Sequence, residues 1–211
     1  MRITHKLQRY ILPSLGRGLG VGLLLCVLCV ACSDDDDSSF PNLLTEMVDC
    51  PTDAQGTINF IVLDNDTKLF VTNPQKELKK NVTYRCLADY ALEDDGKVTL
   101  YGLKGCPVLR DSTDVAQFDP VNVVSLWQTS RYINLHLMPK TQGQGEHGWG
   151  FIADSIVGRH AYLRLHHRQG NDPTSYSTDL YASLPLDLVE ADTITLSIRT
   201  FSGTKDFSFP Q

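Results

Sequence analysis

The signatures of common enzyme classes are missing from this sequence of 211 residues. It has no Gly-x-Ser-x-Gly segment, the sharp turn that presents the nucleophile of many hydrolases. The glycine-rich stretch 143–148 precedes no predicted helix, so it lacks the context of a phosphate-binding loop. No two carboxylates stand out on separate rigid elements, as glycoside hydrolysis requires. We therefore predict no catalytic residues and no enzyme activity, with a metal-dependent hydrolase as the least favoured alternative.

Beyond residue 32 the sequence also lacks the cysteine spacings that are typical of metal sites. The cysteines there are Cys50, Cys86 and Cys106, too far apart for a Cys-x-x-Cys zinc site. Three cysteines allow at most one disulfide, which an exported location would permit. Histidines cluster late in the chain, but the neighbours His166 and His167 would point to opposite faces of a strand. The sequence therefore predicts no metal site and no cofactor.

Basic residues are scarce in most of the chain. The whole sequence has 19 Lys and Arg against 25 Asp and Glu. Four of the basic residues and none of the acidic ones lie within residues 1–31, so the remainder has 15 basic and 25 acidic residues and a net charge of −10. Binding to nucleic acid needs clustered Lys and Arg to neutralise phosphates. We therefore expect no nucleic-acid partner.

The single long apolar run lies near the N-terminus. Residues 1–17 carry the four basic side chains, and residues 18–31 are apolar and too short to span a bilayer comfortably. The run ends in Ala31, and Cys32 follows at once. This order predicts a lipoprotein signal peptide over 1–31, cleavage before Cys32, and membrane attachment through lipid, such as palmitate, on Cys32. An uncleaved membrane anchor is the alternative.

An acidic linker is predicted over 32–49 and an OB-like β-barrel domain over 50–115. The linker begins with small and acidic residues without apolar periodicity, which favours an extended, solvated segment. Beyond it, short runs of β-branched and aromatic residues alternate with turn residues. Five strands in so short a stretch are typical of a small closed barrel. The expected strands are 57–63, 68–72, 81–89, 97–103 and 107–109.

A β-sandwich domain is predicted over 116–211. Residues 131–138 alternate between apolar and polar side chains, the clearest period of two in the chain. No amphipathic helix is visible after residue 44, and turn residues recur every 8–12 residues, as in sandwiches. The predicted fold class is therefore all-β, a small OB-like barrel followed by a β-sandwich. The main expected strands are 121–127, 131–138, 149–153, 160–166, 176–184 and 193–201.

The candidate binding residues are aromatic. Trp127, Tyr132, Trp149 and Tyr176 lie on or beside predicted strands of the second domain. Aromatic rings on a sheet face can stack on sugars or form the centre of a protein interface. The alternative for Trp127 and Trp149 is packing in the core. Either ligand class, an unknown protein or a glycan, remains open at this point.

Parts of the second domain resemble the C-terminal region of the NigD-like lipoproteins of Bacteroidota. The resemblance rests on segments 123–127, 132–136, 163–173 and 181–186. The first domain is similar to the N-terminal OB domain of that family, with Asp94-Asp95-Gly96 in a fitting place. The resemblance extends over roughly 50–209 and implies an OB-type domain followed by a sandwich.

The resemblance also implies a location and a role. The stretch after Cys32 is similar to the acidic signal that directs lipoproteins of this phylum to the cell surface, so a lipid-anchored, surface-exposed outer-membrane protein is expected. Its residues are Ser33, Asp34, Asp35, Asp36 and Asp37. The family name comes from a bacteriocin gene cluster, which suggests a non-enzymatic binding or accessory role related to immunity, with glycan binding as the alternative. One departure is Cys29, where leucine is usual three residues before the lipidated cysteine.

Overall fold

A computed structural model describes residues 42–93, 95–112 and 117–211. The predicted signal peptide, the predicted lipidation site Cys32 and the predicted surface-export signal 33–37 lie outside these ranges. Inside them the chain forms strands and a single short 3-10 helix, so the predicted all-β class is confirmed. In the same ranges, no helix has the length and apolar character needed to cross a membrane.

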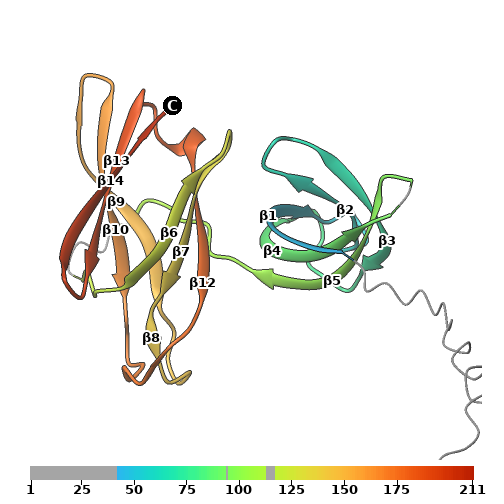
Figure 1. The fold of residues 1–211 in the computed structure, drawn as a ribbon, viewed down its shortest axis with the longest axis horizontal. Helices are drawn as coiled ribbons and strands as arrows, with labels where there is room; N and C mark the ends of the chain where they lie inside the picture. Colours follow the sequence, from blue (N-terminus) through green and yellow to red (C-terminus); the bar gives the residue numbers. More distant parts are fainter. Residues whose placement is uncertain (1–41, 94, 113–116) are drawn as a thin grey trace, which may run out of the picture. The chain divides into compact units, whose positions relative to one another are not determined.

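The first domain is a closed five-stranded barrel, which confirms the predicted barrel (Figure 1). Its strands follow the order β1–β2–β3–β5–β4, with β3 and β5 parallel and the other neighbours antiparallel. The turn between β4 and β5 includes Gly96 at φ +76°, a left-handed conformation that glycine adopts without steric cost. The strands are β1 (Leu43–Pro51), β2 (Ile58–Leu63), β3 (Lys68–Gln75), β4 (Thr83–Leu92) and β5 (Lys97–Gly105).

The predicted start of the barrel and its fifth strand are wrong. Strand β1 begins at Leu43, inside the stretch assigned to the linker, and pairs with β4 over its whole length. Its first half is mostly exposed, so it lacks the apolar alternation that would have marked a strand. Segment 107–109, expected as a barrel strand, instead makes backbone hydrogen bonds to Ser183 of the second domain. The barrel is thus closed by a segment upstream of the predicted domain.

The barrel core contains two of the three cysteines. Cys50 on β1 and Cys86 on β4 are both buried among aliphatic side chains. They lie diagonally across the β1–β4 pair, because Val48 is opposite Cys86 and Cys50 is opposite Tyr84. All three described cysteines are free thiols.

We expect the native protein to react slowly with iodoacetamide at neutral pH. A hydrogen bond with Cys86, together with burial, raises the pKa of Cys50, and burial raises the pKa of Cys106 to about 11. The same thiol contact lowers the pKa of Cys86, but only 6% of that residue is exposed. After unfolding without reductant and alkylation, mass spectrometry should find Cys50, Cys86 and Cys106 all alkylated. Recovery of only one would contradict the free-thiol state.

The second domain is a β-sandwich, as predicted. One sheet has the order β14–β13–β10–β9 and the other β12–β7–β6, with β11 and β8 forming a small separate pair. The predicted strand 176–184 is split between β11 and β12, which belong to different sheets. The elements are β6 (Asn122–Gln128), β7 (Tyr132–Met138), β8 (Lys140–Thr141), β9 (Gly148–Val157), β10 (His160–Arg168), β11 (Tyr176–Ser177), β12 (Leu180–Pro185), the 3-10 helix η1 (Leu186–Leu188), β13 (Thr193–Thr200) and β14 (Gly203–Pro210).

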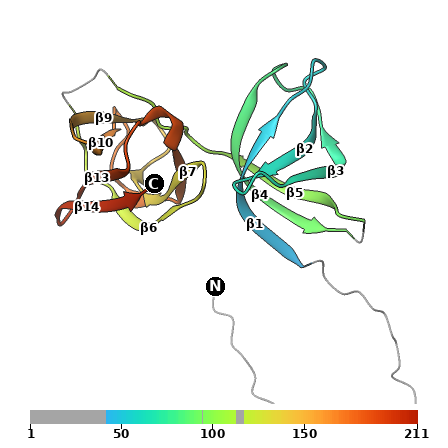
Figure 2. The same ribbon diagram turned by 90° about the horizontal axis from the view of Figure 1, so that it is seen from above.

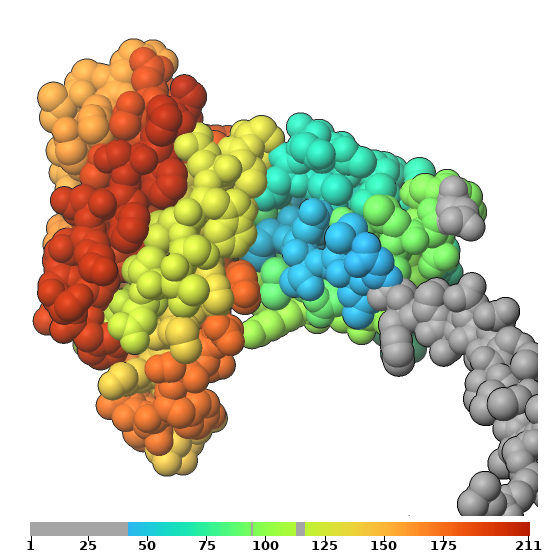
Figure 3. Space-filling view, viewed as in Figure 1, coloured from blue at the N-terminus to red at the C-terminus, as the bar shows by residue number. Residues whose placement is uncertain are grey.

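The sandwich core lies between its two sheets. Ile133, Leu135 and Leu137 of β7 are fully buried, whereas Asn134 and His136 between them point to the opposite face. That opposite face carries the polar contacts to the barrel. At one side of the sandwich, the edge strands β6 and β14 lie next to each other (Figures 1 and 2) and are visible on the surface (Figure 3).

Candidate functional site

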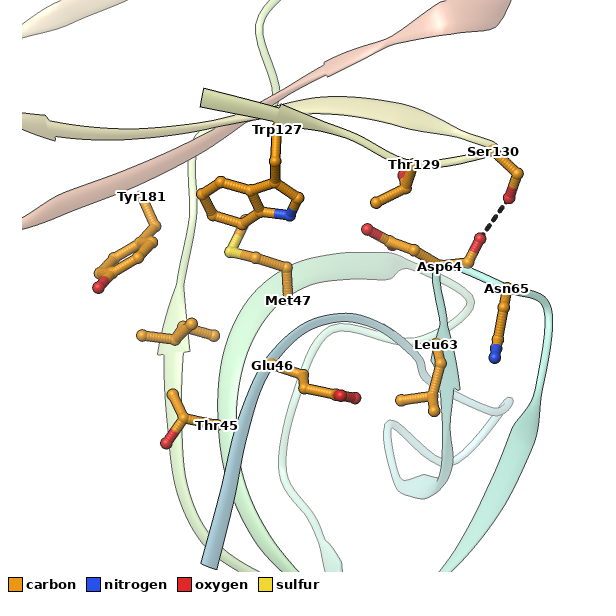
Figure 4. Close-up of a pocket in the computed structure, with 11 residues that line it drawn as sticks. Thr45, Glu46, Met47, Leu63, Asp64, Asn65, Trp127, Thr129, Ser130 and Tyr181 are labelled. Carbon is orange, nitrogen blue, oxygen red and sulfur yellow. Dashed lines mark hydrogen bonds between the residues drawn. The ribbon is translucent and has the colours of Figure 1, made fainter. Parts of the chain in front are cut away.

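A groove of about 640 Å³ lies where the barrel meets the sandwich (Figure 4). The barrel contributes residues of β1, the end of β2 with its turn, and one residue of β4. The sandwich contributes the end of β6 with the following turn, and one residue of β12. The lining residues are Thr45, Glu46, Met47, Leu63, Asp64, Asn65, Leu87, Trp127, Thr129, Ser130 and Tyr181.

The groove combines an apolar surface with acidic groups. Trp127 is 36% exposed, and both it and Met47 line the groove (Figure 4). The two charged residues in the lining, Glu46 and Asp64, are both acidic. Glu46 accepts a hydrogen bond of 2.9 Å from the hydroxyl of Tyr90, which orients its carboxylate. Such a surface suits a ligand with apolar or aromatic groups and positive charge.

A buried arginine holds the two walls of the groove together. The side chain of Arg85 on β4 is 1% exposed. It donates to Asp49 Oδ1 at 3.2 Å and to Asp64 Oδ2 at 2.8 Å in the barrel. It also donates to Asn134 Oδ1 at 3.1 Å and to Ser183 Oγ at 3.0 Å in the sandwich. Because one guanidinium bridges both domains with charge-assisted hydrogen bonds, the groove walls are preorganised.

Tyr132 belongs to this junction and not to the groove. Its ring packs on the guanidinium of Arg85, with the carbon of that group 4.0 Å from the ring centroid. Its hydroxyl donates to both oxygens of Asp49, at 3.2 and 3.1 Å. Burial and the charge of Asp49 raise the pKa of Tyr132, which keeps the hydroxyl protonated as a donor. Arg131 pairs with the same carboxylate at 2.6 Å. These contacts give Tyr132 a positioning role.

The structure does not bring the four candidate aromatic residues together. Trp127 lies in the groove and Tyr132 at the junction. Trp149 stacks on His167 with ring centroids 4.1 Å apart, and Tyr176 is 56% exposed on β11. Sequence reasoning did not select Met47 or Leu63 as groove residues. They come from two different strands of the barrel, and only the packing of barrel against sandwich makes them neighbours of Trp127.

The histidines are also dispersed. His136 stacks on Tyr181 and bonds to Asp179 at 2.7 Å, while His160 stacks on Tyr162 and bonds to Thr195 at 2.8 Å. Across the described part of the chain, no three His, Cys, Asp or Glu residues are arranged to hold a metal ion.

Two histidines form a buried hydrogen-bond chain in the sandwich. His147 contacts Asp172 Oδ2 through Nε2 at 3.2 Å and His167 Nε2 through Nδ1 at 3.0 Å. His167 Nδ1 faces the carbonyl oxygen of Asp119 at 3.1 Å. This hydrogen-bond chain therefore has an acceptor at both ends, the carboxylate of Asp172 and the carbonyl oxygen of Asp119. With its ring proton on Nδ1, His167 donates to the carbonyl oxygen of Asp119 and its Nε2 is left as an acceptor facing His147.

The aspartate of this chain organises a loop. Asp172 accepts hydrogen bonds from the Thr141 hydroxyl and from the amides of Gln142 and Gln144. The Thr141 hydroxyl, and then these amides, hold the pKa of Asp172 well below its usual range. The carboxylate thus ties the segment after β8 to the turn after β10. We interpret this network as a structural element that keeps the sandwich loops in place.

Acid should destabilise the protein through His167. Burial lowers the pKa of His167 to about 4 in the folded state, against about 6.5 in the unfolded chain. Between these values the unfolded chain binds a proton that the folded chain does not, so stability falls as the pH drops from 6.5 to 4. At about 1.4 kcal/mol per pKa unit, this loss is of the order of 3 kcal/mol.

Urea unfolding at pH 7.5 and 4.5 measures this loss. The control is His167→Gln, which keeps a polar side chain but cannot titrate. We expect a smaller pH dependence in the variant than in the wild type. An equal dependence in both proteins would assign the acid sensitivity to other groups.

Taken together, the fold and groove define a class of protein: two β-domains joined by a buried hydrogen-bond network, with a surface groove at their junction. Residues 106–210 match the family model of the NigD-like C-terminal beta sandwich domain. The chain belongs to the NigD-like family, which confirms the resemblance seen in the sequence. No curated protein matches the sequence.

Solved structures of the same two-domain fold come from Bacteroidota. A NigD-like immunity protein from Bacteroides caccae is similar at 22% identity and a TM-score of 0.65, over 81% of this chain and 98% of that one. A protein described as toxin related, from Parabacteroides distasonis, is similar at 15% identity and a TM-score of 0.67, over 81% and 93%. A Bacteroides fragilis protein described as a lipoprotein is similar at 13% identity and a TM-score of 0.56, over 79% and 96%. At these identities the likeness shows the fold alone.

Proposed function

We propose that this chain is a non-enzymatic, lipid-anchored binding protein with an immunity-type role, and that the groove at the junction holds its ligand. The observation that carries the proposal is the groove itself: Trp127 is exposed beside apolar side chains in a cleft whose walls Arg85 holds in place. A preformed cleft reduces the entropy cost of binding. The descriptions of two similar structures, one as an immunity protein and one as toxin related, support the immunity-type role.

The proposed location is the outer surface of the outer membrane. The Ala31–Cys32 junction and the acidic stretch 33–37 support lipid anchoring and surface export. The similar structure described as a lipoprotein supports anchoring as well. At the surface, the groove would meet a secreted toxin before that toxin reaches its target.

The proposal is tested with the secreted small-protein fraction of the parent strain. A deletion strain should be inhibited by this fraction, and the wild-type gene should restore growth. Trp127→Ala should fail to restore it, whereas Tyr162→Ala should succeed, because Tyr162 is similarly exposed but lies outside the groove. Uninhibited growth of the deletion strain would contradict the immunity role.

Glycan binding is the second candidate function. Trp127 and Tyr181 both line the groove, and Glu46 lies in the same lining. Aromatic faces beside a carboxylate are a common way to hold a sugar ring. Titration of the protein with polysaccharide fractions from the cell surface, followed by tryptophan fluorescence, tests this alternative. A response that Trp127→Ala abolishes would favour the glycan, and no response to any fraction would exclude it.

A further inference from the structure

Strand β6 is an edge strand with no partner along one side. Within the described residues it pairs only with β7, at the end of the sheet β12–β7–β6. Its sequence, Asn-Val-Val-Ser-Leu-Trp-Gln, contains no charged residue, no proline and no glycine. Proteins usually protect an edge with charged residues, proline or a β-bulge, because its unpaired N–H and C=O groups recruit other strands, and of these β6 has only the bulge between Val123 and Ser125. The neighbouring edge strand β14 contains Lys205, Asp206 and Pro210, so β6 is the less protected of the two.

A hollow lies on each face of the sheet beside β6. On the core side, a hollow of about 490 Å³ lies between β6 and β14. The two strands are side by side on the surface (Figure 3). Its apolar lining includes Leu126, Phe207 and Phe209. On the barrel side lies the groove that contains Trp127 (Figure 4). Alternate side chains of a strand point to opposite faces of its sheet. A strand added beyond β6 would therefore direct alternate side chains into the two hollows.

We propose that the free edge of β6 pairs with an extended segment of a partner polypeptide in which apolar residues alternate with basic ones. This inference rests on the proposed binding function and specifies its ligand as a peptide strand. The apolar side chains fill the hollow against Phe207 and Phe209. The basic side chains enter the groove beside Glu46.

The backbone edge selects the chemical class of the ligand. A row of unpaired peptide groups is satisfied by another extended polypeptide, which forms main-chain hydrogen bonds along its length. The β-bulge between Val123 and Ser125 interrupts the register of β6 with β7, so the regular edge extends over Ser125–Gln128. Side-chain contacts in the two hollows then supply the specificity beyond this short edge.

Charge selects a basic segment. Both charged residues in the groove lining are acidic. Asp64 is already paired with Arg85, so the exposed Glu46 is the carboxylate left for a cationic ligand. Residues 32–211 carry 15 basic and 25 acidic side chains, a net charge of −10. A cationic segment is therefore attracted over long range and paired at the groove, whereas a second copy of this acidic chain is repelled.

The test uses a synthetic octapeptide that alternates lysine and valine, with the full-length mature protein. Its two controls are the same peptide with an N-methyl group on every residue, which leaves no main-chain donor for a ladder, and a glutamate–valine octapeptide. We expect the lysine–valine peptide to bind at least about tenfold more tightly than either control by calorimetry. We also expect it to slow amide hydrogen exchange in β6 and not in β14.

Substitutions of opposite charge at one position of β6, with a control on β14, give a matched set of variants. Ser125 is exposed on β6 and Thr204 is exposed on β14. Ser125→Lys should weaken binding about tenfold by repulsion, and Ser125→Glu should tighten it, while Thr204→Lys should have little effect. Both substitutions at Ser125 are on the surface, so the fold is retained.

Three outcomes would overturn the inference. Equal affinity for the N-methylated peptide would show that no ladder forms. Slower exchange in β14 would assign the edge to the wrong strand. A dimer with β6 already protected in the absence of peptide would make a second copy the occupant. If Ser125→Lys still restores growth to the deletion strain while Trp127→Ala does not, the strand pairing fails and the groove function stands.

Discussion

Replacing Arg85 with alanine should lower the free energy of unfolding by about 3–5 kcal/mol. The substitution removes one guanidinium that bonds to Asp49, Asp64, Asn134 and Ser183. Asp64, whose side chain is 12% exposed, would then lie in the junction without this cation, whereas Asp49 would keep its pair with Arg131. Removing one partner of a buried ion pair is strongly destabilising, because the other charge stays buried.

The same substitution should uncouple the two domains. The wild type should unfold in one transition, since barrel and sandwich share the Arg85 network, and the variant should show two transitions in calorimetry. Arg85→Lys, which keeps the charge but loses the planar fork, should fall between them. Arg159→Ala is the control, because Arg159 forms a bidentate pair with Asp192 that is largely exposed to solvent. A single transition in Arg85→Ala with wild-type stability would refute the bridging role.

Replacing Cys32 with serine should release nearly all of the protein from the membrane. The predicted anchor is lipid on this one residue, and a serine cannot carry a thioether-linked lipid. Without acyl chains, the acidic body has little affinity for a bilayer. Detergent phase partitioning of the cleaved forms should find the wild type in the detergent phase and the variant in the aqueous phase.

Cys29 offers a matched comparison. Cys29→Leu restores the residue that is usual at this place in the processing site, so its mature fraction should equal or exceed that of the wild type. Intact-mass measurement of each protein reports both cleavage and lipid. If Cys32→Ser entered the detergent phase to the same extent as the wild type, lipid anchoring would be contradicted. The uncleaved apolar segment would then be favoured as the membrane anchor.

The strands that could be predicted are those with a clear period. Residues 131–138 alternate regularly, and β7 (Tyr132–Met138) matches them almost residue for residue, because one face packs in the core and the other faces the barrel. Strand β1 could not be found in this way. Its exposed first half has no apolar alternation, and its pairing partner β4 lies some 40 residues away in the sequence. Pairing at that distance leaves no local pattern.

The groove residues also divide into those that could be predicted from the sequence and those that could not. Trp127 and Tyr181 could be selected from the sequence as aromatic residues on strands, but two of their groove neighbours, Met47 and Leu63, could not. Likewise, nothing around Arg85 in the sequence indicates that it bridges two domains. Its partners come from β1, β7, β12 and the turn after β2, and they meet only when the domains pack.

The sequence by itself determined the all-β class, the order of barrel and sandwich, and the expected anchor at Cys32. These properties follow from composition, local alternation and a short contiguous motif, all of which are properties of neighbouring residues. The tertiary structure alone decided where the barrel begins, which aromatic residue faces a cleft, and which strand has a free edge. These depend on burial and pairing between residues far apart in the chain, and burial is a property of the packed molecule.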